Sequence, residues 1–135
     1  MEDLLRLAKV FRAAQIVAHD AHNNCRGPSF FADHKFLGQV YKTYEEAYDS
    51  LVERYIGLTG QPVDGISLAR EALELAPDSD VQGIWDTLSM FERTICKVCY
   101  TFCEQEGVSE GTKQLVGELC NQAEMRDYKL KQRMG

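Results

Sequence analysis

The sequence predicts an all-α protein built on four long helices, and three observations favour this fold class. Apolar residues recur at intervals of three and four along most of the chain, which is the spacing of helices that bury one stripe. The 135 residues include only three prolines, too few for a loop-rich or all-β fold. The periodic segments are joined by two short links and one long link, the pattern of a helical bundle. The length fits a single domain, residues 1–135.

The first two long helices are expected to form an antiparallel pair. The first covers residues 3–26 and the second runs from about 31 to 58, with a link of only a few residues between them. Gly27 can adopt the left-handed conformation that ends a helix, and Ser29 can cap the next helix. The second helix should end at Thr59-Gly60-Gln61-Pro62.

The second half of the chain repeats this layout. A long link holds a short helix over residues 67–75 and leads to a third long helix at about 80–106. A fourth helix covers 110 to about 134, after another short link. Four long helices with one long crossover, here carrying a short helix between the second and third, form the ferritin-like arrangement.

Charge and composition exclude several classes of protein. The net charge is −6, whereas a nucleic-acid binder needs a basic surface. No run of about 18 apolar residues is present and no signal peptide is visible, so we expect no contact with a membrane. Five cysteines form an odd number without the spacing of a disulfide framework. We therefore expect a cytoplasmic protein.

All three histidines lie in one stretch of the sequence, at His19, His22 and His34. On a helical projection His22 lies about 20° from Phe11, on the buried stripe of the first helix. A polar ring there needs a partner, and a hydrogen bond to a backbone carbonyl would be enough to explain one buried histidine. The short link, however, brings the two helix ends together. His22 and His34 should therefore lie at similar heights, as two metal ligands would.

Asp49 and Glu53 lie four residues apart on the second helix and share one face, which is the spacing for two carboxylates on one metal. Asp49 follows His34 by about 22 Å of helix, so one chain cannot bring all four side chains to one metal. Either the carboxylates form a solvated helix face, or a second copy supplies them across a two-fold axis, giving two identical sites per dimer. Imidazole and carboxylate ligands suit ferrous iron, with zinc, manganese and copper as competitors.

A di-iron site inside one bundle is not expected. Such a site needs a Glu-x-x-His motif on each of two helices. The residues three positions before the histidines are Ile16, His19 and Phe31, and the last two long helices contain no histidine.

The segment from His19 to His34, HDAHNNCRGPSFFADH, resembles the signature of the Dps family, the mini-ferritins. That signature is H-x-x-H-W-N-V-x-G-P, with a second histidine twelve residues after the iron-binding one. The match continues without a gap to residue 62 and includes Tyr41, Glu46, Asp49, Glu53, Arg54, Gly60 and Pro62. A weaker match runs through the last helix at Thr112, Leu115, Glu124, Tyr128 and Leu130.

The resemblance implies a hollow shell, normally a dodecamer of identical subunits, with ferroxidase sites at the two-fold interfaces. Ferrous iron would be oxidised there by hydrogen peroxide or oxygen and stored inside as ferric mineral, which protects against oxidative damage. Carried over by position, His22 and His34 of one subunit bind iron together with Asp49 and Glu53 of a second subunit. Glu53 is placed to bridge two metals.

Three features depart from the family pattern. Gly38 stands four residues after His34, where the family usually has a carboxylate, so we expect one well-bound iron per site and a weak second one. Asn23 replaces the tryptophan of the signature. The chain begins almost directly with its first helix, so we expect a short member without the Lys-rich tail and without DNA binding. The basic residues near its other end complement the dipole of the last helix, and they are Arg126, Lys129, Lys131 and Arg133.

Cys96, Cys99 and Cys103 form a C-x-x-C-x-x-x-C pattern within the third long helix. We interpret it first as packing, because cysteine is often buried as a small apolar residue. A soft-metal or redox role and an iron–sulfur cluster are the alternatives.

Two other functions remain open alongside the ferroxidase. The first is a shell-forming or metal-binding structural protein in which Gly38 has abolished ferroxidation. The second is a metal-binding dimer that does not close into a shell.

Overall fold

The structure is a computed structural model that describes residues 1–77 and 83–135. Within these ranges the chain forms helices and no strands, and the helices are α1 (Glu2–Asn24), α2 (Phe30–Thr59), α3 (Gly65–Leu75), α4 (Ile84–Cys103) and α5 (Glu110–Met134). The predicted all-α fold, with four long helices and a short one in the crossover, is confirmed. No helix of the described residues is long and apolar enough to cross a membrane.

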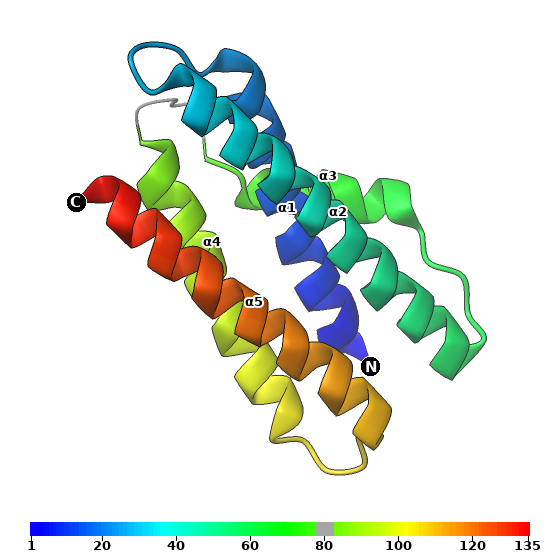
Figure 1. The fold of residues 1–135 in the computed structure, drawn as a ribbon. Helices are drawn as coiled ribbons and strands as arrows, with labels where there is room; N and C mark the ends of the chain where they lie inside the picture. The colour runs from blue at the N-terminus through cyan, green and yellow to red at the C-terminus, as the bar shows by residue number, and fades with distance from the viewer. Residues whose placement is uncertain (78–82) are drawn as a thin grey trace.

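The four long helices pack as two antiparallel pairs, α1 with α2 and α4 with α5 (Figure 1). α1 also packs against α4, and the short α3 lies against α1 on the outside of the bundle. The interior is lined by the stripe residues of each long helix. Fully buried side chains include Leu4, Leu7, Phe11, Leu37, Tyr44, Leu51, Leu88, Ile95, Phe102, Val116 and Leu130.

The ends of the helices follow the predicted stop signals with small differences. Gly27 and Gly60 adopt φ values of 102° and 70°, in the left-handed region that favours glycine. Ser29 occupies the N-cap position of α2 as predicted, although its side chain makes no capping hydrogen bond. The expected start of the third long helix, near residue 80, lies outside the described residues. That helix ends at Cys103, three residues before the predicted end.

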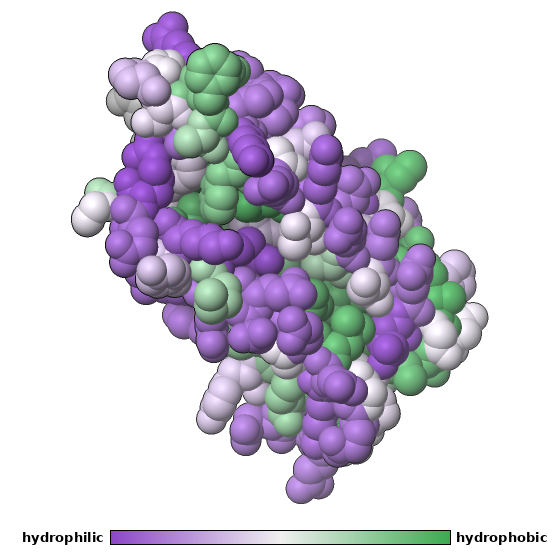
Figure 2. Space-filling model, viewed as in Figure 1, coloured by the Kyte–Doolittle hydropathy of each residue, from purple (hydrophilic) through white to green (hydrophobic). Residues whose placement is uncertain are grey.

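Arginine side chains span the distance between α2 and α5. Arg133 makes a two-bonded ion pair with Asp33, with distances of 3.1 Å and 3.0 Å, near one end of the bundle. Arg54 donates to the Thr112 hydroxyl at 3.1 Å towards the other end. Figure 2 shows that apolar side chains interrupt the polar surface along this junction. Two arginine side chains therefore link the two helices.

A charged pair is buried in the middle of the bundle. Glu92 of α4 is fully buried and accepts a 2.6 Å bond from Nε of Arg126 of α5. The guanidinium carbon lies 5.0 Å from the centre of the Tyr44 ring. Burial raises the pKa of Glu92 to about 7, against the lowering effect of Arg126. Sequence reasoning missed this pair, although Glu92 lies one turn from the buried Leu88 and Ile95 and so falls on the apolar stripe.

Candidate metal centre

His22 and His34 meet where α1 ends and α2 begins, as their sequence positions predicted. Their rings stack with centroids 3.8 Å apart and an angle of 21° between the planes. Each ring also reaches the backbone of the other residue. His22 Nδ1 lies 2.8 Å from the carbonyl oxygen of His34, and His34 Nδ1 lies 2.9 Å from the carbonyl oxygen of His22.

This reciprocal pair of hydrogen bonds sets the tautomer of both rings. A backbone carbonyl can only accept, so Nδ1 of each ring must carry the proton and donate it. Each neutral imidazole then keeps the free lone pair on Nε2. A second ring nitrogen held by a backbone carbonyl is the usual arrangement around a metal-binding histidine. The bonds to carbonyls thus explain how these rings are accommodated, and they also leave both rings ready to bind a metal.

The surroundings of the histidine pair are aromatic and partly open to solvent. His19 is exposed and stacks on Tyr41 with centroids 4.1 Å apart, and the edge of Tyr41 approaches the His22 ring. On the other side, Phe30 stacks on His34 with centroids 4.9 Å apart. The rings of Tyr41 and Phe30 thus flank the histidine pair on its two sides.

Gly38 lies directly against the His22 ring. A Cβ atom at this position would meet Cε1 of His22 at 2.9 Å and Nδ1 at 3.1 Å, which is too close for the present ring position. The His22 imidazole therefore occupies the space that a carboxylate side chain at position 38 would need. Sequence analysis identified the lost ligand at Gly38 but not that the ring of His22 fills the space beside it.

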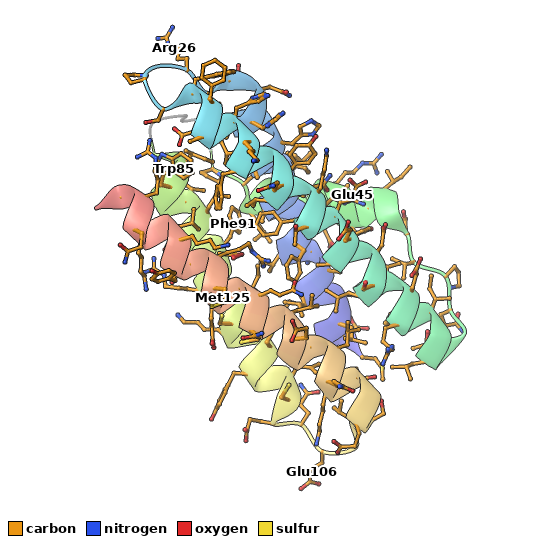
Figure 3. The ribbon with its side chains drawn as sticks, viewed as in Figure 1. Arg26, Glu45, Trp85, Phe91, Glu106 and Met125 are labelled. Atoms are coloured by element: carbon orange, nitrogen blue, oxygen red, sulfur yellow. The ribbon has the colours of Figure 1, made fainter. Side chains whose placement is uncertain are left out.

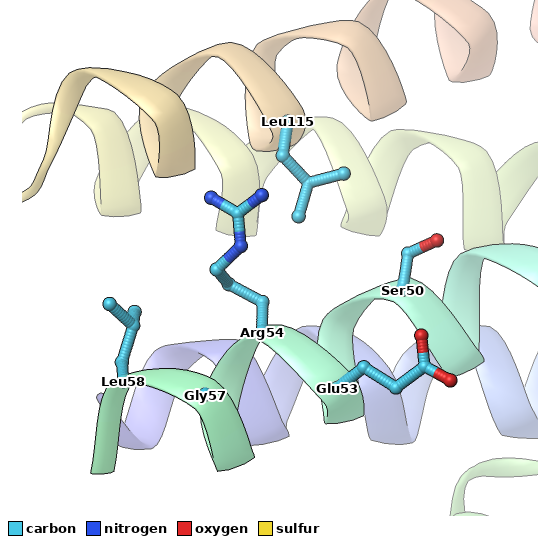
Figure 4. Close-up of a pocket in the computed structure, with 6 residues that line it drawn as sticks. All are labelled: Ser50, Glu53, Arg54, Gly57, Leu58 and Leu115. Carbon is cyan, nitrogen blue, oxygen red and sulfur yellow. The ribbon is translucent and has the colours of Figure 1, made fainter.

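Asp49 and Glu53 lie further along α2 and are exposed. Because α2 is one continuous helix, they lie about 22 Å and more from His34 along its axis. In the described part of the chain, neither carboxylate has a hydrogen-bond or ion-pair partner. Figure 4 shows Glu53 at an open depression beside Arg54, whose side chain points towards α5 and Leu115. The structure thus brings the two histidines together and leaves the two carboxylates apart from them and free.

The interior of the bundle offers no comparable ligand set among the described residues. Its buried carboxylates are Asp33, Glu92 and Asp127, and each already has a partner: Arg133, Arg126, and Ser89 with Lys131. A guanidinium at Glu92 supplies the positive charge that a metal would otherwise provide. Each buried carboxylate is thus already engaged by a side chain of the same bundle.

The cysteine pattern has two different environments. Cys99 is buried in the core with 1% of its surface exposed, which agrees with packing. Cys96 faces α5 instead, where its Sγ lies 3.9 Å from the carbonyl oxygen of Cys120. Burial, together with the neighbouring Cys120 and Glu124, raises the pKa of Cys96 to about 12. Sequence spacing could not show the contact with Cys120 and Glu124, because they belong to another helix.

The chain is similar to known proteins in its fold more than in its sequence. No family model matches the chain, and no curated protein sequence matches it. Among solved structures, Dps from Staphylococcus aureus superposes with a TM-score of 0.87 and 19% identity, covering 99% of this chain and 93% of that one. A DPS protein from Vibrio cholerae O1, described as a member of a broad superfamily of ferritin-like diiron-carboxylate proteins, superposes with a TM-score of 0.80 and 20% identity. This second match covers 99% of this chain and 87% of the other.

The chain therefore has the ferritin-like bundle fold. More particularly, it has the fold of the Dps proteins, with the short helix of the crossover included in a superposition that spans almost the whole chain. The resemblance found in the sequence is confirmed at the level of the fold.

Proposed function

We propose that this chain is a Dps-type mini-ferritin that binds ferrous iron, oxidises it with hydrogen peroxide or oxygen, and stores the ferric product inside an oligomeric shell. The observation that carries the proposal is the reciprocal bonding of His22 and His34, which leaves Nε2 of both rings free for a metal. The unpaired carboxylates of Asp49 and Glu53 complete the ligand set. They come from a second subunit, since one continuous helix separates them from the histidines of their own chain.

A two-fold axis between two subunits would bring the histidines of one beside the carboxylates of the other. If the α2 helices of two subunits run antiparallel, the histidine end of one lies beside the carboxylates of the other, and the same contact occurs twice. We extend the proposal to a dodecamer built from such dimers, as the sequence resemblance implies, and to a cytoplasmic location, as the cysteine pattern favours. Three of the four basic side chains near the end of α5 are engaged in ion pairs, namely Arg126, Lys131 and Arg133. The proposal therefore includes no DNA binding.

The stacking of the rings favours two neighbouring ferrous ions per site. Metal–imidazole bonds of about 2 Å lie in the plane of each ring, so two nearly parallel rings cannot readily point at one ion. Each imidazole would instead serve its own ion, with Glu53 between them. One of the two ions has the poorer site because position 38 offers no carboxylate. This fits one well-bound iron per site and a weak second one.

The side chains of the chain bind and position the ions and are not themselves oxidised or reduced. Ferrous iron is the substrate, and each ion gives up one electron, so one peroxide molecule oxidises two ions. The side chains must collect the ions, hold them close together and tolerate the added positive charge. Two imidazoles and two carboxylates suit ferrous iron, and the carboxylates offset the charge of the ferric product.

A complementation experiment tests the shared site. One variant carries His22→Ala and His34→Ala, and the other carries Asp49→Ala and Glu53→Ala. Each alone should lose fast ferrous oxidation, because every site lacks half its ligands. A mixed dimer has one site with all four ligands and one with none. Random co-assembly after subunit exchange should therefore restore about a quarter of the wild-type rate.

Glu45→Ala provides the matched control, since Glu45 is an exposed carboxylate of the same helix α2 (Figure 3). It should oxidise iron at the wild-type rate. Absence of any recovery in the mixture, with exchange verified by mass spectrometry, would contradict a site shared between subunits. Full activity in either double variant would contradict the assignment of its residues.

The second candidate function is a shell that binds metal but does not oxidise it, and Gly38 is the observation that favours it. If Gly38 has removed the second iron altogether, the wild-type chain should bind one ferrous ion at the histidine pair and show no accelerated oxidation with either oxidant. Stopped-flow absorption with peroxide and with oxygen distinguishes this candidate from the ferroxidase.

A further inference from the structure

A second group of ligand side chains lies between α4 and α5, away from the histidines. It consists of Cys96 of α4 with Cys120 and Glu124 of α5, and their ligand atoms all lie within 4.8 Å of one another. In the described residues this is the only group of three or more such side chains from one chain. Cys120 and Glu124 are four residues apart, so helix geometry places both on the face of α5 that Cys96 meets.

The separations are close to those that a tetrahedral metal requires. With zinc–sulfur bonds of about 2.3 Å and zinc–oxygen bonds of about 2.0 Å, two sulfurs lie about 3.8 Å apart and a sulfur and an oxygen about 3.5 Å apart. The Sγ of Cys120 already lies 3.7 Å from Oε1 of Glu124. The remaining distances need to contract by up to about 1.3 Å, which a change of side-chain rotamer can supply.

The site is accessible to solvent, and no cationic side chain of the described residues neutralises the carboxylate of Glu124. Cys96 and Cys120 are half-buried, and Glu124 is exposed. In the described residues no lysine or arginine pairs with Glu124, whose recorded contact is the Cys120 thiol. All five cysteines of the chain are free, so neither sulfur is engaged in a disulfide.

We propose that Cys96, Cys120 and Glu124 form a zinc-binding site that joins α4 to α5, with water in the fourth position. Two sulfurs and one carboxylate oxygen suit Zn²⁺, which accepts both kinds of ligand in tetrahedral geometry. Cuprous copper prefers sulfur and has no need of the carboxylate. Binding releases the two thiol protons to solvent, and no oxidation or reduction takes place. The site is separate from the proposed iron centre and does not depend on it.

Cobalt(II) substitution tests the ligand set directly. Fully reduced, metal-free protein is titrated with Co²⁺, whose bonds to thiolate give a strong near-ultraviolet charge-transfer absorption that histidine and carboxylate ligands do not give. We expect the band to saturate at one Co²⁺ per chain and to disappear when Zn²⁺ is added. Cys96→Ser and Cys120→Ser should abolish it, and Glu124→Gln should weaken Co²⁺ binding at least tenfold.

Cys25→Ser is the matched control, because Cys25 lies at the end of α1 and its thiol contacts the His22 carbonyl. It should keep the full band, and so should the His22→Ala, His34→Ala variant, which separates this site from the iron centre. A band that survives Cys96→Ser, or one that Glu124→Gln leaves unchanged, overturns the ligand set.

Alkylation of the wild-type protein gives a test that needs no variant. Zn²⁺ should slow the alkylation of Cys96 and Cys120 by iodoacetamide at least tenfold and leave that of Cys25 unchanged, as read by mass spectrometry of peptides. Equal alkylation with and without Zn²⁺ overturns the proposal. So does a reduced protein that forms a Cys96–Cys120 disulfide in the presence of saturating Zn²⁺ as fast as in its absence.

Discussion

The backbone of Gly38 lies directly against the ring of His22, so the ring leaves no room for a side chain at position 38. Glycine in the middle of a helix costs about 1 kcal/mol relative to alanine, so its presence in α2 asks for a reason. The reason is the imidazole, which lies 2.9 Å from where a Cβ would stand and is held there by the carbonyl of His34.

Replacing Gly38 by alanine should therefore disturb the metal centre. The new methyl group displaces the ring and breaks its bond to the His34 carbonyl, so we expect ferrous iron to bind about tenfold more weakly. The gain in helix propensity is offset by the steric cost of about 1–3 kcal/mol. Calorimetric titration with Fe²⁺ under anaerobic conditions measures the affinity.

Gly117→Ala is the control for that substitution. Gly117 lies in α5, and an added Cβ would meet nothing within 4 Å. Its replacement should stabilise the protein by up to about 1 kcal/mol and leave iron binding unchanged. Iron affinity equal to wild type in the Gly38→Ala variant would show that the ring is not held as the structure places it.

The buried carboxyl of Glu92 predicts an unusual dependence of stability on pH. Its pKa is about 7 in the folded chain and near the ordinary 4.5 in the unfolded chain, so the folded state binds more protons between these values. The contribution of Glu92 is therefore fully present below pH 4.5 and is lost as pH rises towards 7. The difference in pKa corresponds to roughly 3 kcal/mol.

Urea unfolding at several pH values, compared with Glu92→Gln, isolates this contribution. The free energy of unfolding of the variant should fall less than that of the wild type between pH 4.5 and 7. Glu45→Gln, at an exposed position, should keep the wild-type slope. Parallel pH profiles for wild type and Glu92→Gln would mean that Glu92 is already ionised in the folded protein at low pH.

At the scale of elements, arginine side chains link α2 to α5. The pair of Asp33 and Arg133 is the best placed of these contacts, because Asp33 is buried and both carboxylate oxygens accept a bond. The guanidinium also lies 4.8 Å from the centre of the Trp85 ring, which Figure 3 places near the end of α5.

Asp33→Asn should lower the free energy of unfolding by about 1–2 kcal/mol, a range reduced because Arg133 is partly exposed. The matched control is Glu71→Gln, which removes an exposed ion pair with Lys9 at 3.5 Å and should cost less than about 1 kcal/mol. Thermal unfolding of both variants measures the difference. Equal losses in the two would show that the α2–α5 contact does not depend on this pair.

Sequence periodicity predicted the helices well because each long helix buries its own stripe, and such a stripe is local information. The position of α2 relative to α1 was also predictable, since Gly27 and a short link leave little choice. The contacts between α2 and α5 were not. Asp33 and Arg133 are a hundred residues apart, and nothing near either residue indicates its partner.

The same division holds for the candidate metal centre. Pairing of His22 with His34 followed from helix heights, whereas the bonds to each other's carbonyls depend on ring orientation, which spacing does not fix. The place of Asp49 and Glu53 in a shared site stays a prediction, because it concerns two chains. Glu124 entered the sequence argument only as a family match, and its contact with Cys120 came from the structure.

At the scale of the whole molecule, the proposed function needs an assembly. Light scattering after size exclusion should give a mass close to twelve subunits for the wild type. The His22→Ala and Asp49→Ala variants should give the same mass, since the ligands are not what holds the interface. A stable monomer would exclude shared sites and the storage of mineral together.

The net charge of the molecule bears on whether it binds DNA. With a net charge of −6 and most of the basic end of α5 engaged in ion pairs, the protein has little to offer to phosphates. No band shift with duplex DNA is expected at about 150 mM salt. A clear shift under that condition would mean that the assembled particle presents a basic surface that a single chain does not.

The two imidazoles are tied crosswise to the main chain of α1 and α2, and this has a consequence for the loop between the helices. Any ion that fixes the rings also fixes both helix ends, and with them the short turn through Gly27. Metal binding at the centre would therefore restrict the motion of the backbone in this turn, although the turn does not contact the metal. An empty subunit and a loaded one would differ there in how readily amide protons exchange, although their folds are the same.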